Sequence, residues 1–522
     1  MLTRGFVGSV LVLLGGLVVS TLPRSTWLMG HDLLVDLRGA EAGRMAGLAV
    51  VLLGLGLLAA AWLSLCRHVA VAQGEEREDA VYLVRHAAVV WSAPLVLAPP
   101  LFSRDGWSYA AQGMLAHVGI SPYEYGPGVL AGLPVAEAVD PRWMTTVTPY
   151  GPVPVAVGEL AAGVTGNPWV LVVAHRLVAL VGLALLAWAV PRLAQWSGLD
   201  PALASAVVLA SPLMIANGVG GLHNDLLMVG LMAAALVAAV ERGWVAGALL
   251  GGLAAAVKLP GGLVCVGVAL VGLPLTASFA ARVRRLAVVG LAAVGTLLGL
   301  GVASGLGSGW VHGLAVPATV NTPLSVTTLV GGLLDRLAWL LGLGLAPATF
   351  LGLVRQLGTA AMLVTVLVVA LRWRTGDRAG AVQAVALVVA TTVLLSPVVH
   401  LWYLLWVVPF VATLRLSRVA TAGLLAASTG FGLVAPMDSS LHGAYYAIVL
   451  GSMLVAMLVP LLLLTRRSRA RIERIVSAEW IPAAGSVAGV AVEPEPAQVR
   501  AGAMTPATSP SVIRPPDVPG AA

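Results

Sequence analysis

Charged residues are scarce in this chain. Asp, Glu, Lys and Arg make up only 10% of its 522 residues, whereas 59% are hydrophobic. A soluble domain carries roughly a quarter charged residues, and its core cannot hold this much apolar surface. The mean hydropathy of +0.95 therefore excludes a soluble globular protein and indicates a polytopic membrane protein. The alternating ten-residue segments of a membrane β-barrel are missing, which favours an all-α fold.

Cysteines and common catalytic motifs are also few or missing. Cys66 and Cys265 both lie in apolar stretches far apart in the sequence, which predicts small core residues and no disulfide framework. There is no Walker-type glycine loop, zinc-ligand spacing or serine-nucleophile elbow. ATP-driven chemistry is therefore unsupported, and no cofactor is expected. The lack of an internal repeat weakens the case for an inverted-repeat transporter.

Apolar runs long enough to cross a membrane recur along the chain. A spanning helix needs about 20 apolar residues. We predict an all-α, polytopic transmembrane helical bundle of about 14 spans, the first being a span or a signal anchor. The predicted spans are 5–22, 45–66, 86–102, 169–190, 202–218, 225–241, 244–257, 259–279, 286–305, 350–371, 380–396, 402–415, 419–435 and 445–465.

The cations predict the orientation of these spans. Most Lys and Arg residues fall in short loops on one side, which the positive-inside rule makes cytoplasmic. This placement argues against nucleic acid as the reason for the net charge of +7. Both termini are then cytoplasmic, and a transmembrane domain, 1–475, precedes a disordered tail, 476–522. The large external loop 103–168 and the medium loop 306–349 are expected to carry short interfacial helices, including an amphipathic helix over 321–342.

Ionisable or aromatic polar groups interrupt the apolar runs at five places, all on the predicted outer side. Such groups are costly at membrane depth and usually face a cavity or a partner. Each site alone has a structural explanation as a helix cap, a snorkelling side chain or an aromatic belt. Together they predict a shared cavity. The sites are Arg104-Asp105, His175-Arg176, His223-Asn224-Asp225, Lys258, and His400 with Trp402 and Tyr403.

These side chains suit one kind of chemistry, the transfer of a sugar from a polyprenyl phosphate to an acceptor hydroxyl. The donor arrives in the lipid already activated, and its leaving phosphate is stabilised by Lys and Arg. A single carboxylate then suffices to deprotonate the acceptor hydroxyl.

Several segments resemble a known family. The segments "FSRDGWSYAAQG", "SPYEYGP", "TPYGP", "GLHNDLLMVGLM", "AAAVKLP", "WYLLW" and "PMDSSLHGAYY" are similar, in the same order over about 86–465, to the polyprenol-phosphomannose-dependent α-1,6-mannopyranosyltransferases of actinobacteria. These are integral-membrane glycosyltransferases of the C superfamily. The resemblance implies a multi-pass plasma-membrane enzyme whose active site faces outside. It would transfer mannose from polyprenyl phosphomannose to the 6-hydroxyl of a lipid-anchored α-mannan acceptor, in lipomannan and lipoarabinomannan biosynthesis. The resemblance does not separate the initiating from the elongating branch.

The resemblance also implies roles for individual residues. Asp105 would be the general base of an inverting single displacement, and Tyr109 and Gln112 would position sugar hydroxyls. His223, Asn224 and Asp225 match the family's "HN-acidic" motif and are expected to bind substrate.

The resemblance further implies that Trp402 and Tyr403 line the donor or acceptor groove. Arg176 and Lys258 are candidates for the donor phosphate, an inference from charge and depth. Arg104 could orient Asp105, hold the phosphate or anchor the helix end, and the role of His400 is open.

Three alternatives stay open. Some members of the superfamily use a divalent metal, although no ligand cluster is visible here, and neutralisation of the phosphate by Arg and Lys makes a metal unnecessary. The sugar could differ, as in a glucosyl- or arabinosyltransferase dependent on another polyprenyl phosphate sugar. A lipid-linked sugar flippase or transporter is the third alternative.

Overall fold

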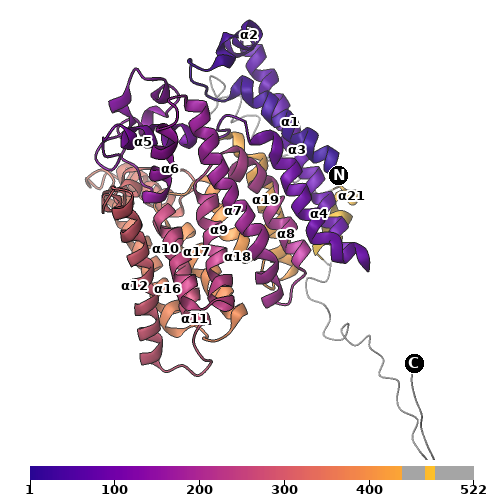
Figure 1. Ribbon diagram of the computed structural model, residues 1–522, viewed down its shortest axis with the longest axis vertical. Helices are drawn as coiled ribbons and strands as arrows, with labels where there is room; N and C mark the ends of the chain where they lie inside the picture. Colours follow the sequence, from indigo (N-terminus) through magenta and orange to yellow (C-terminus); the bar gives the residue numbers. More distant parts are fainter. Residues whose placement is uncertain (438–464, 477–522) are drawn as a thin grey trace, which may run out of the picture. The chain divides into compact units, whose positions relative to one another are not determined.

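The computed structural model describes residues 1–437 and 465–476, which form helices and loops without a β-strand element (Figure 1). The all-α prediction is confirmed for this part of the chain. The longer helices are α1 (Leu2–Val19), α3 (Glu41–Val71), α4 (Glu75–Ser92), α5 (Asp105–His117), α6 (Pro152–Ala162), α7 (Pro168–Trp196), α9 (Asp225–Glu241), α10 (Trp244–Val257), α12 (Phe279–Ala303), α15 (Val326–Leu340), α16 (Thr349–Arg372), α17 (Arg378–Leu395), α19 (Arg418–Leu433) and α21 (Arg466–Val476).

Shorter helices connect these elements. The α-helical ones are α2 (Asp32–Gly39), α8 (Pro201–Leu209), α11 (Val264–Val271), α13 (Trp310–Gly313), α14 (Val316–Thr319) and α18 (Leu404–Val411). Single turns and π-helical segments are η1 (Trp27–Gly30), η2 (Ala93–Leu95), η3 (Pro127–Leu130), η4 (Pro134–Ala136), η5 (Pro141–Trp143), η6 (Met214–Gly220), η7 (Leu259–Leu263), η8 (Leu401–Tyr403) and η9 (Ala435–Met437).

The protein is a multi-pass membrane protein, but the predicted count of about 14 spans is not confirmed. Six described helices are long and apolar enough to cross a membrane: α1, α3, α7, α12, α16 and α17. The bent pair α8 and η6 would make a seventh. Helices also occupy the other described predicted spans, but α10 has 14 residues and α11 and α18 only 8 each. The predicted span 445–465 lies outside the described residues, as does the tail beyond Val476.

Two predicted spans are displaced by proline. The run 86–102 was expected to be helical, but α4 begins at Glu75 and ends at Ser92, because Pro94, Pro99 and Pro100 follow. The run 202–218 is broken at Pro212, where α8 and η6 meet at a bend of 55°. Both breaks leave irregular backbone next to the candidate site.

Small residues allow helix backbones to approach closely. A Cβ atom at Gly8 of α1 would lie 2.8 Å from the carbonyl oxygen of Gly54 in α3. A Cβ at Gly230 of α9 would lie 2.3 Å from the carbonyl oxygen of Gly182 in α7. Such contacts are typical of membrane helix packing, so these glycines allow the helices to pack closely.

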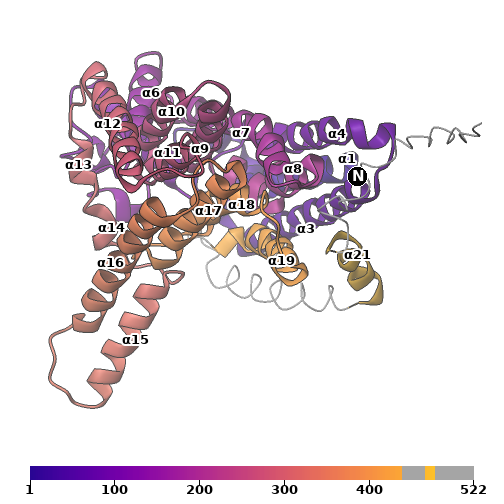
Figure 2. The same cartoon turned by 90° about the horizontal axis from the view of Figure 1, so that it is seen from below.

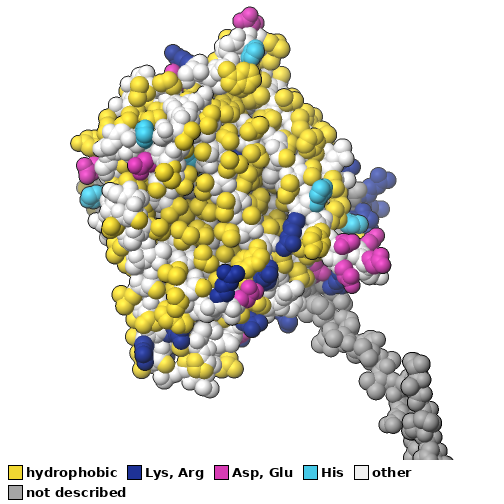
Figure 3. All heavy atoms as spheres, viewed as in Figure 1, with side chains coloured by type: hydrophobic (Ala, Val, Ile, Leu, Met, Phe, Trp, Pro, Cys, Tyr) yellow, Lys and Arg dark blue, Asp and Glu magenta, His cyan; other side chains and the backbone are white. Residues whose placement is uncertain are grey.

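The outward faces of the helices are apolar. Leu160, Leu291 and Val302 are 72–75% exposed, and Figure 3 shows hydrophobic side chains over most of one face, with charged side chains toward its lower part and rim. Exposed apolar surface of this extent fits contact with lipid.

The two predicted external loops contain helices, but they differ in burial. α5 is almost completely buried against α6 and α7, which corrects the expectation of an interfacial helix. Its close packing depends on Gly113, where a Cβ would come 2.4 Å from the backbone of Gly158 in α6. α15 confirms a helix within 321–342, and in Figure 2 it projects with α16 away from the other helices.

Candidate active site

Asp105 and Asp225 each stand at the first residue of a helix, α5 and α9. Three residues before each lies a buried bulky residue in the left-handed region, Phe102 with φ 64° and Leu222 with φ 57°. Such residues adopt this conformation only where the surrounding structure enforces it, often at functional sites. The backbone thus turns sharply before each carboxylate, and a helix N-terminus stabilises the negative charge.

Arg176 of α7 joins these two turns. Its guanidinium is fully buried, and all five N–H groups donate to backbone carbonyls. This corrects the prediction that Arg176 binds the donor phosphate, because no N–H remains for a ligand. The N–H of Leu101 adds a 2.9 Å bond to the Gly220 carbonyl. The acceptors of Arg176 are Val96, Ala98 and Pro99 before α5, and Val219 and Gly220 before α9.

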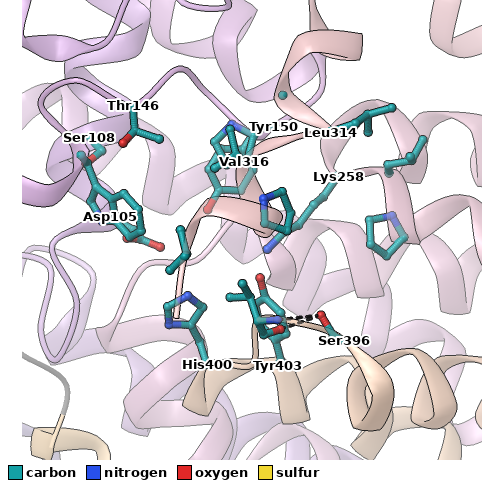
Figure 4. Close-up of a pocket in the computed structure, with 18 of the residues that line it drawn as sticks. Asp105, Ser108, Thr146, Tyr150, Lys258, Leu314, Val316, Ser396, His400 and Tyr403 are labelled. Atoms are coloured by element: carbon teal, nitrogen blue, oxygen red, sulfur yellow. Dashed lines mark hydrogen bonds between the residues drawn. The ribbon is translucent and has the colours of Figure 1, made fainter. Parts of the chain in front are cut away.

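A first cavity of about 290 Å³ lies beside α5. Asp105 and Lys258 face it from opposite sides, with Tyr150 above and His400 and Tyr403 below in the view of Figure 4. Part of its wall is apolar, formed by Leu259, Leu314, Val316 and Pro317.

Lys258 is held by one carboxylate and three aromatic rings. Its Nζ donates to Asp225 Oδ1 over 2.9 Å, and the same oxygen accepts from Trp406 Nε1 over 2.6 Å. Nζ also lies 5.3, 4.5 and 5.0 Å from the ring centroids of Tyr150, Tyr403 and Trp406. The ion pair is almost fully buried, so Asp225 fixes the cation at the cavity wall.

His223 lies behind Asp105 in a stack of three rings. Its Nδ1 is 3.8 Å from Asp105 Oδ2, and its ring stacks on Trp402 with centroids 3.9 Å apart. His400 stacks on Trp402 at 4.3 Å. His400 and Trp402 reach the cavity, whereas His223 is 1% exposed.

A second cavity of about 570 Å³ adjoins the first among the described residues. Six residues line both cavities, so Asp105 belongs to a shared wall. The other shared residues are Trp143, Thr146, Val320, His400 and Trp402.

Polar and charged groups gather in the second cavity. Arg104 donates to the carbonyls of Ala138 and Val139 over 2.9 and 2.8 Å, and burial lowers the pKa of its guanidinium. Burial alone would raise the pKa of Asp140, but hydrogen bonds from Arg142 hold it below its usual value. Asp140 is therefore a weaker base than an ordinary aspartate, which leaves Asp105 as the better candidate.

Tyr109 and Tyr150 form a buried pair in the first cavity. Their hydroxyl oxygens are 3.0 Å apart. Burial, and then the charge of Asp105, raises the pKa of Tyr109 well above its usual value. Burial, followed by Tyr109 and Asp105, has the same effect on the pKa of Tyr150. Both phenols thus stay protonated, and because one O–H donates to the other hydroxyl, the pair has one O–H left to donate to a ligand.

The structure brings most of the predicted site residues to these cavities. The first is lined by Asp105, Tyr109, Gln112, Lys258, Trp402 and Tyr403, and the second by Arg104, Asp105 and Trp402. His223, Asn224 and Asp225 are buried and line neither cavity. Their expected contact with substrate therefore stays a prediction, while in this structure His223 lies beside Asp105 and Asp225 bonds to Lys258.

Sequence reasoning missed the aromatic residues Trp143, Tyr150 and Trp406. Tyr150 lies in the quoted segment "TPYGP" and Trp406 closes "WYLLW", so both were visible as motif residues without a role. In residues 1–437 and 465–476 no group of three or more His, Cys, Asp or Glu could hold a metal ion.

The fold and the cavities define a class of protein: a multi-pass membrane protein with a carboxylate and a cation facing each other in a buried, aromatic-lined site. Comparison with known proteins identifies the family within this class. Residues 2–274 match the family model described as "Alpha-(1->6)-mannopyranosyltransferase, N-terminal domain". Residues 327–466 match a model described as "MptB C-terminal domain".

Individual relatives agree with these models. Alpha-(1->6)-mannopyranosyltransferase A of Mycobacterium tuberculosis is 34% identical, over 84% of this chain and 85% of the relative. The proteins named alpha-(1->6)-mannopyranosyltransferase A and B in Corynebacterium glutamicum are each 29% identical, covering 72% and 86% of this chain and 80% and 79% of the relatives. The chain belongs to the α-(1→6)-mannopyranosyltransferase family and is a glycosyltransferase.

Proposed function

We propose that the protein transfers mannose from polyprenyl phosphomannose to the 6-hydroxyl of an α-mannoside on a lipid-anchored mannan. One observation carries this proposal: Asp105 stands in the wall shared by two cavities, opposite Lys258 in the first. A base between two chambers can reach a hydroxyl in one while the sugar phosphate lies in the other.

The first cavity suits the donor. Lys258 supplies a positive charge for the phosphate, and its salt bridge to Asp225 keeps that charge in place. The apolar side chains of Leu314, Val316 and Pro317 suit the first isoprene units. Tyr109 and Tyr150 are hydrogen-bonded to each other, so the pair has one O–H left to donate to a mannose hydroxyl.

The second cavity suits the acceptor. It combines polar groups, including Arg142, Asn321 and Thr322, with the indole faces of Trp143 and Trp402. Sugar rings bind well to such combinations because their C–H faces pack on aromatic rings while their hydroxyls form hydrogen bonds.

The reaction is a single inverting displacement. Asp105 accepts the proton of the acceptor 6-hydroxyl as this oxygen attacks C1 of mannose. The bond from C1 to the phosphate oxygen breaks, and its electron pair leaves with the polyprenyl phosphate. Lys258 offsets the charge that develops on the phosphate, so the β-linked donor yields an α-linked product.

The distribution of Lys and Arg supports an active site on the outer side of the plasma membrane. In that setting the product is the α-1,6-mannan backbone of lipomannan and lipoarabinomannan. The sugar rests on the family, since no residue described here specifically recognises the axial 2-hydroxyl of mannose. Another polyprenyl-phosphate-sugar donor is therefore the second candidate, and a lipid-sugar flippase the third.

The test is transfer of labelled mannose from polyprenyl phosphomannose to a synthetic α-mannoside by the purified protein. We expect Asp105→Asn to lower kcat by about 10²–10⁴-fold, the usual contribution of a general base. Asp32→Asn is the matched control, because Asp32 is also the first residue of a helix, α2, but is exposed.

Each other outcome overturns part of the proposal. Wild-type transfer by Asp105→Asn would remove Asp105 as the base. Transfer from a labelled glucose or arabinose donor in preference to mannose would overturn the choice of sugar. Movement of the donor across vesicles without any transfer would favour the flippase.

A further inference from the structure

We propose that His223 is a positioning residue that donates a hydrogen bond from Nδ1 to the Asp105 carboxylate during transfer and so sets the pH range of the reaction. This rests on the proposed function, in which Asp105 is the base.

The unused hydrogen-bonding capacity of His223 points toward Asp105. Nδ1 is buried and has no hydrogen-bond partner among the described residues. The carboxylate facing it is that of Asp105, with Oδ2 3.8 Å away, and Lys258 and His400 also interact electrostatically with the ring. An approach of about 1 Å would make a normal hydrogen bond, and bonds of this kind commonly tighten when substrate binds.

The orientation of the imidazole is fixed on two sides. One face stacks on Trp402 at an interplanar angle of 13°, and His400 stacks on Trp402 at 9°. At the ring edge, a Cβ at Gly221 would come only 2.8 Å from His223 Nε2. The ring cannot turn freely, so Nδ1 stays directed toward the carboxylate.

The two turns before α5 and α9 hold this pair together. Arg176 bonds to both turns, and the Leu101 N–H bonds to Gly220. Asp105 and His223 come from segments far apart in the sequence, but their backbones are fixed to one another. Small movements of either residue are therefore limited to side chains.

The chemistry gives the direction of the effect. An ionised carboxylate only accepts hydrogen bonds, and a donor to it favours the ionised form. The donor keeps Asp105 ionised at lower pH, until the carboxylate takes the proton from the acceptor. The other charged or titratable groups around Asp105 are Arg104, Tyr109, Asp140, Arg142, Tyr150, Asp225, Lys258, His400 and Tyr403, and all of them remain when His223 alone is changed.

The test compares pH profiles of kcat/KM for mannosyl transfer. His223→Phe keeps a flat ring on Trp402 but removes the hydrogen-bond donor. The acid limb of its kcat/KM profile should move to higher pH by about one unit, which is a tenfold loss of kcat/KM at pH values below that limb. His223→Asn retains an amide N–H close to the position of Nδ1 and should restore most of the wild-type profile. His400→Phe is the matched control, because it changes the other imidazole of the stack, and its acid limb should not move.

The outcomes separate this inference from the proposed function. An equal loss for His223→Phe at every pH, or no change, would overturn the positioning role while Asp105→Asn still abolishes transfer. A shifted limb in His400→Phe as well would assign the effect to the stack. Full activity of Asp105→Asn would instead overturn the proposed function. Elution of each variant as a single species from size-exclusion chromatography in detergent checks that it is folded.

Discussion

Removing the guanidinium of Arg176 should destabilise the protein more than it weakens donor binding. In Arg176→Met the apolar stem remains, but five backbone carbonyls lose this donor, and four of the five lost bonds are buried. Gly220 keeps its bond from Leu101, whereas Ala98 and Pro99 lie in irregular backbone. A buried acceptor left unsatisfied costs about 1–3 kcal/mol, so we expect a loss of about 3–5 kcal/mol after partial relaxation. Arg176→Lys offers three donors and should lose about half as much.

Cys66 provides the assay in a Cys265→Ala background, which removes the partly exposed second thiol. Cys66 is fully buried, so a thiol-reactive dye labels it only when the protein unfolds in detergent. The labelling temperature should fall in the order wild type, Arg176→Lys, Arg176→Met. Arg85→Met is the control, because Arg85 bonds to one carbonyl, that of Ala187, from a half-buried position, and it should change little.

The reasoning fails if Arg176→Met unfolds like the wild type. It also fails if this variant keeps its stability and raises only the KM for polyprenyl phosphomannose, since that would return Arg176 to the donor phosphate. A decrease equal to that of Arg85→Met would show that the five bonds contribute little.

Two further predictions concern the cation and the packing of α5. Lys258→Met leaves Asp225 buried without its cation, which should lower the free energy of unfolding by about 3–5 kcal/mol. The double variant Lys258→Met/Asp225→Asn should recover the unfolding temperature but not mannosyl transfer. Recovery of both would contradict a role of Lys258 in donor binding. Gly113→Ala places a Cβ 2.4 Å from the Gly158 backbone and should destabilise by about 1–3 kcal/mol. In Gly290→Ala of α12 the new Cβ has nothing within 4 Å, so equal unfolding temperatures for the two alanine variants would contradict the close approach of α5 and α6.

The sequence predicted where helices lie better than how many of them cross the membrane, because hydropathy is a local property. Each apolar run carries its preference for lipid in its own side chains, so helices occur wherever the described runs were predicted. Their ends were less predictable. Pro94 and Pro212 are visible in the sequence. Whether a proline kinks a membrane helix, ends it or is accommodated in it depends on whether neighbouring groups can satisfy the backbone hydrogen-bonding groups that the proline frees.

The charged motifs also combine a feature that the local sequence predicts with one that it does not. Their residue types and order are enough to place Asp105 and Lys258 among the site candidates. Their contacts could not be predicted. Asp225 bonds to Lys258 across 33 residues and to Trp406 across 181, and no local pattern encodes such distances.

An all-helical membrane protein, its family and the chemical groups available to it can all be derived from the amino-acid sequence. The contacts of each group depend on the folded chain: Arg176 binds backbone, Asp225 holds Lys258, and Asp105 reaches the wall between two cavities. The physical reason is that a charge in a low-dielectric interior takes its role from its nearest partners. Folding brings those partners together from distant segments, so the sequence predicts which charged groups are present but not which of them form pairs.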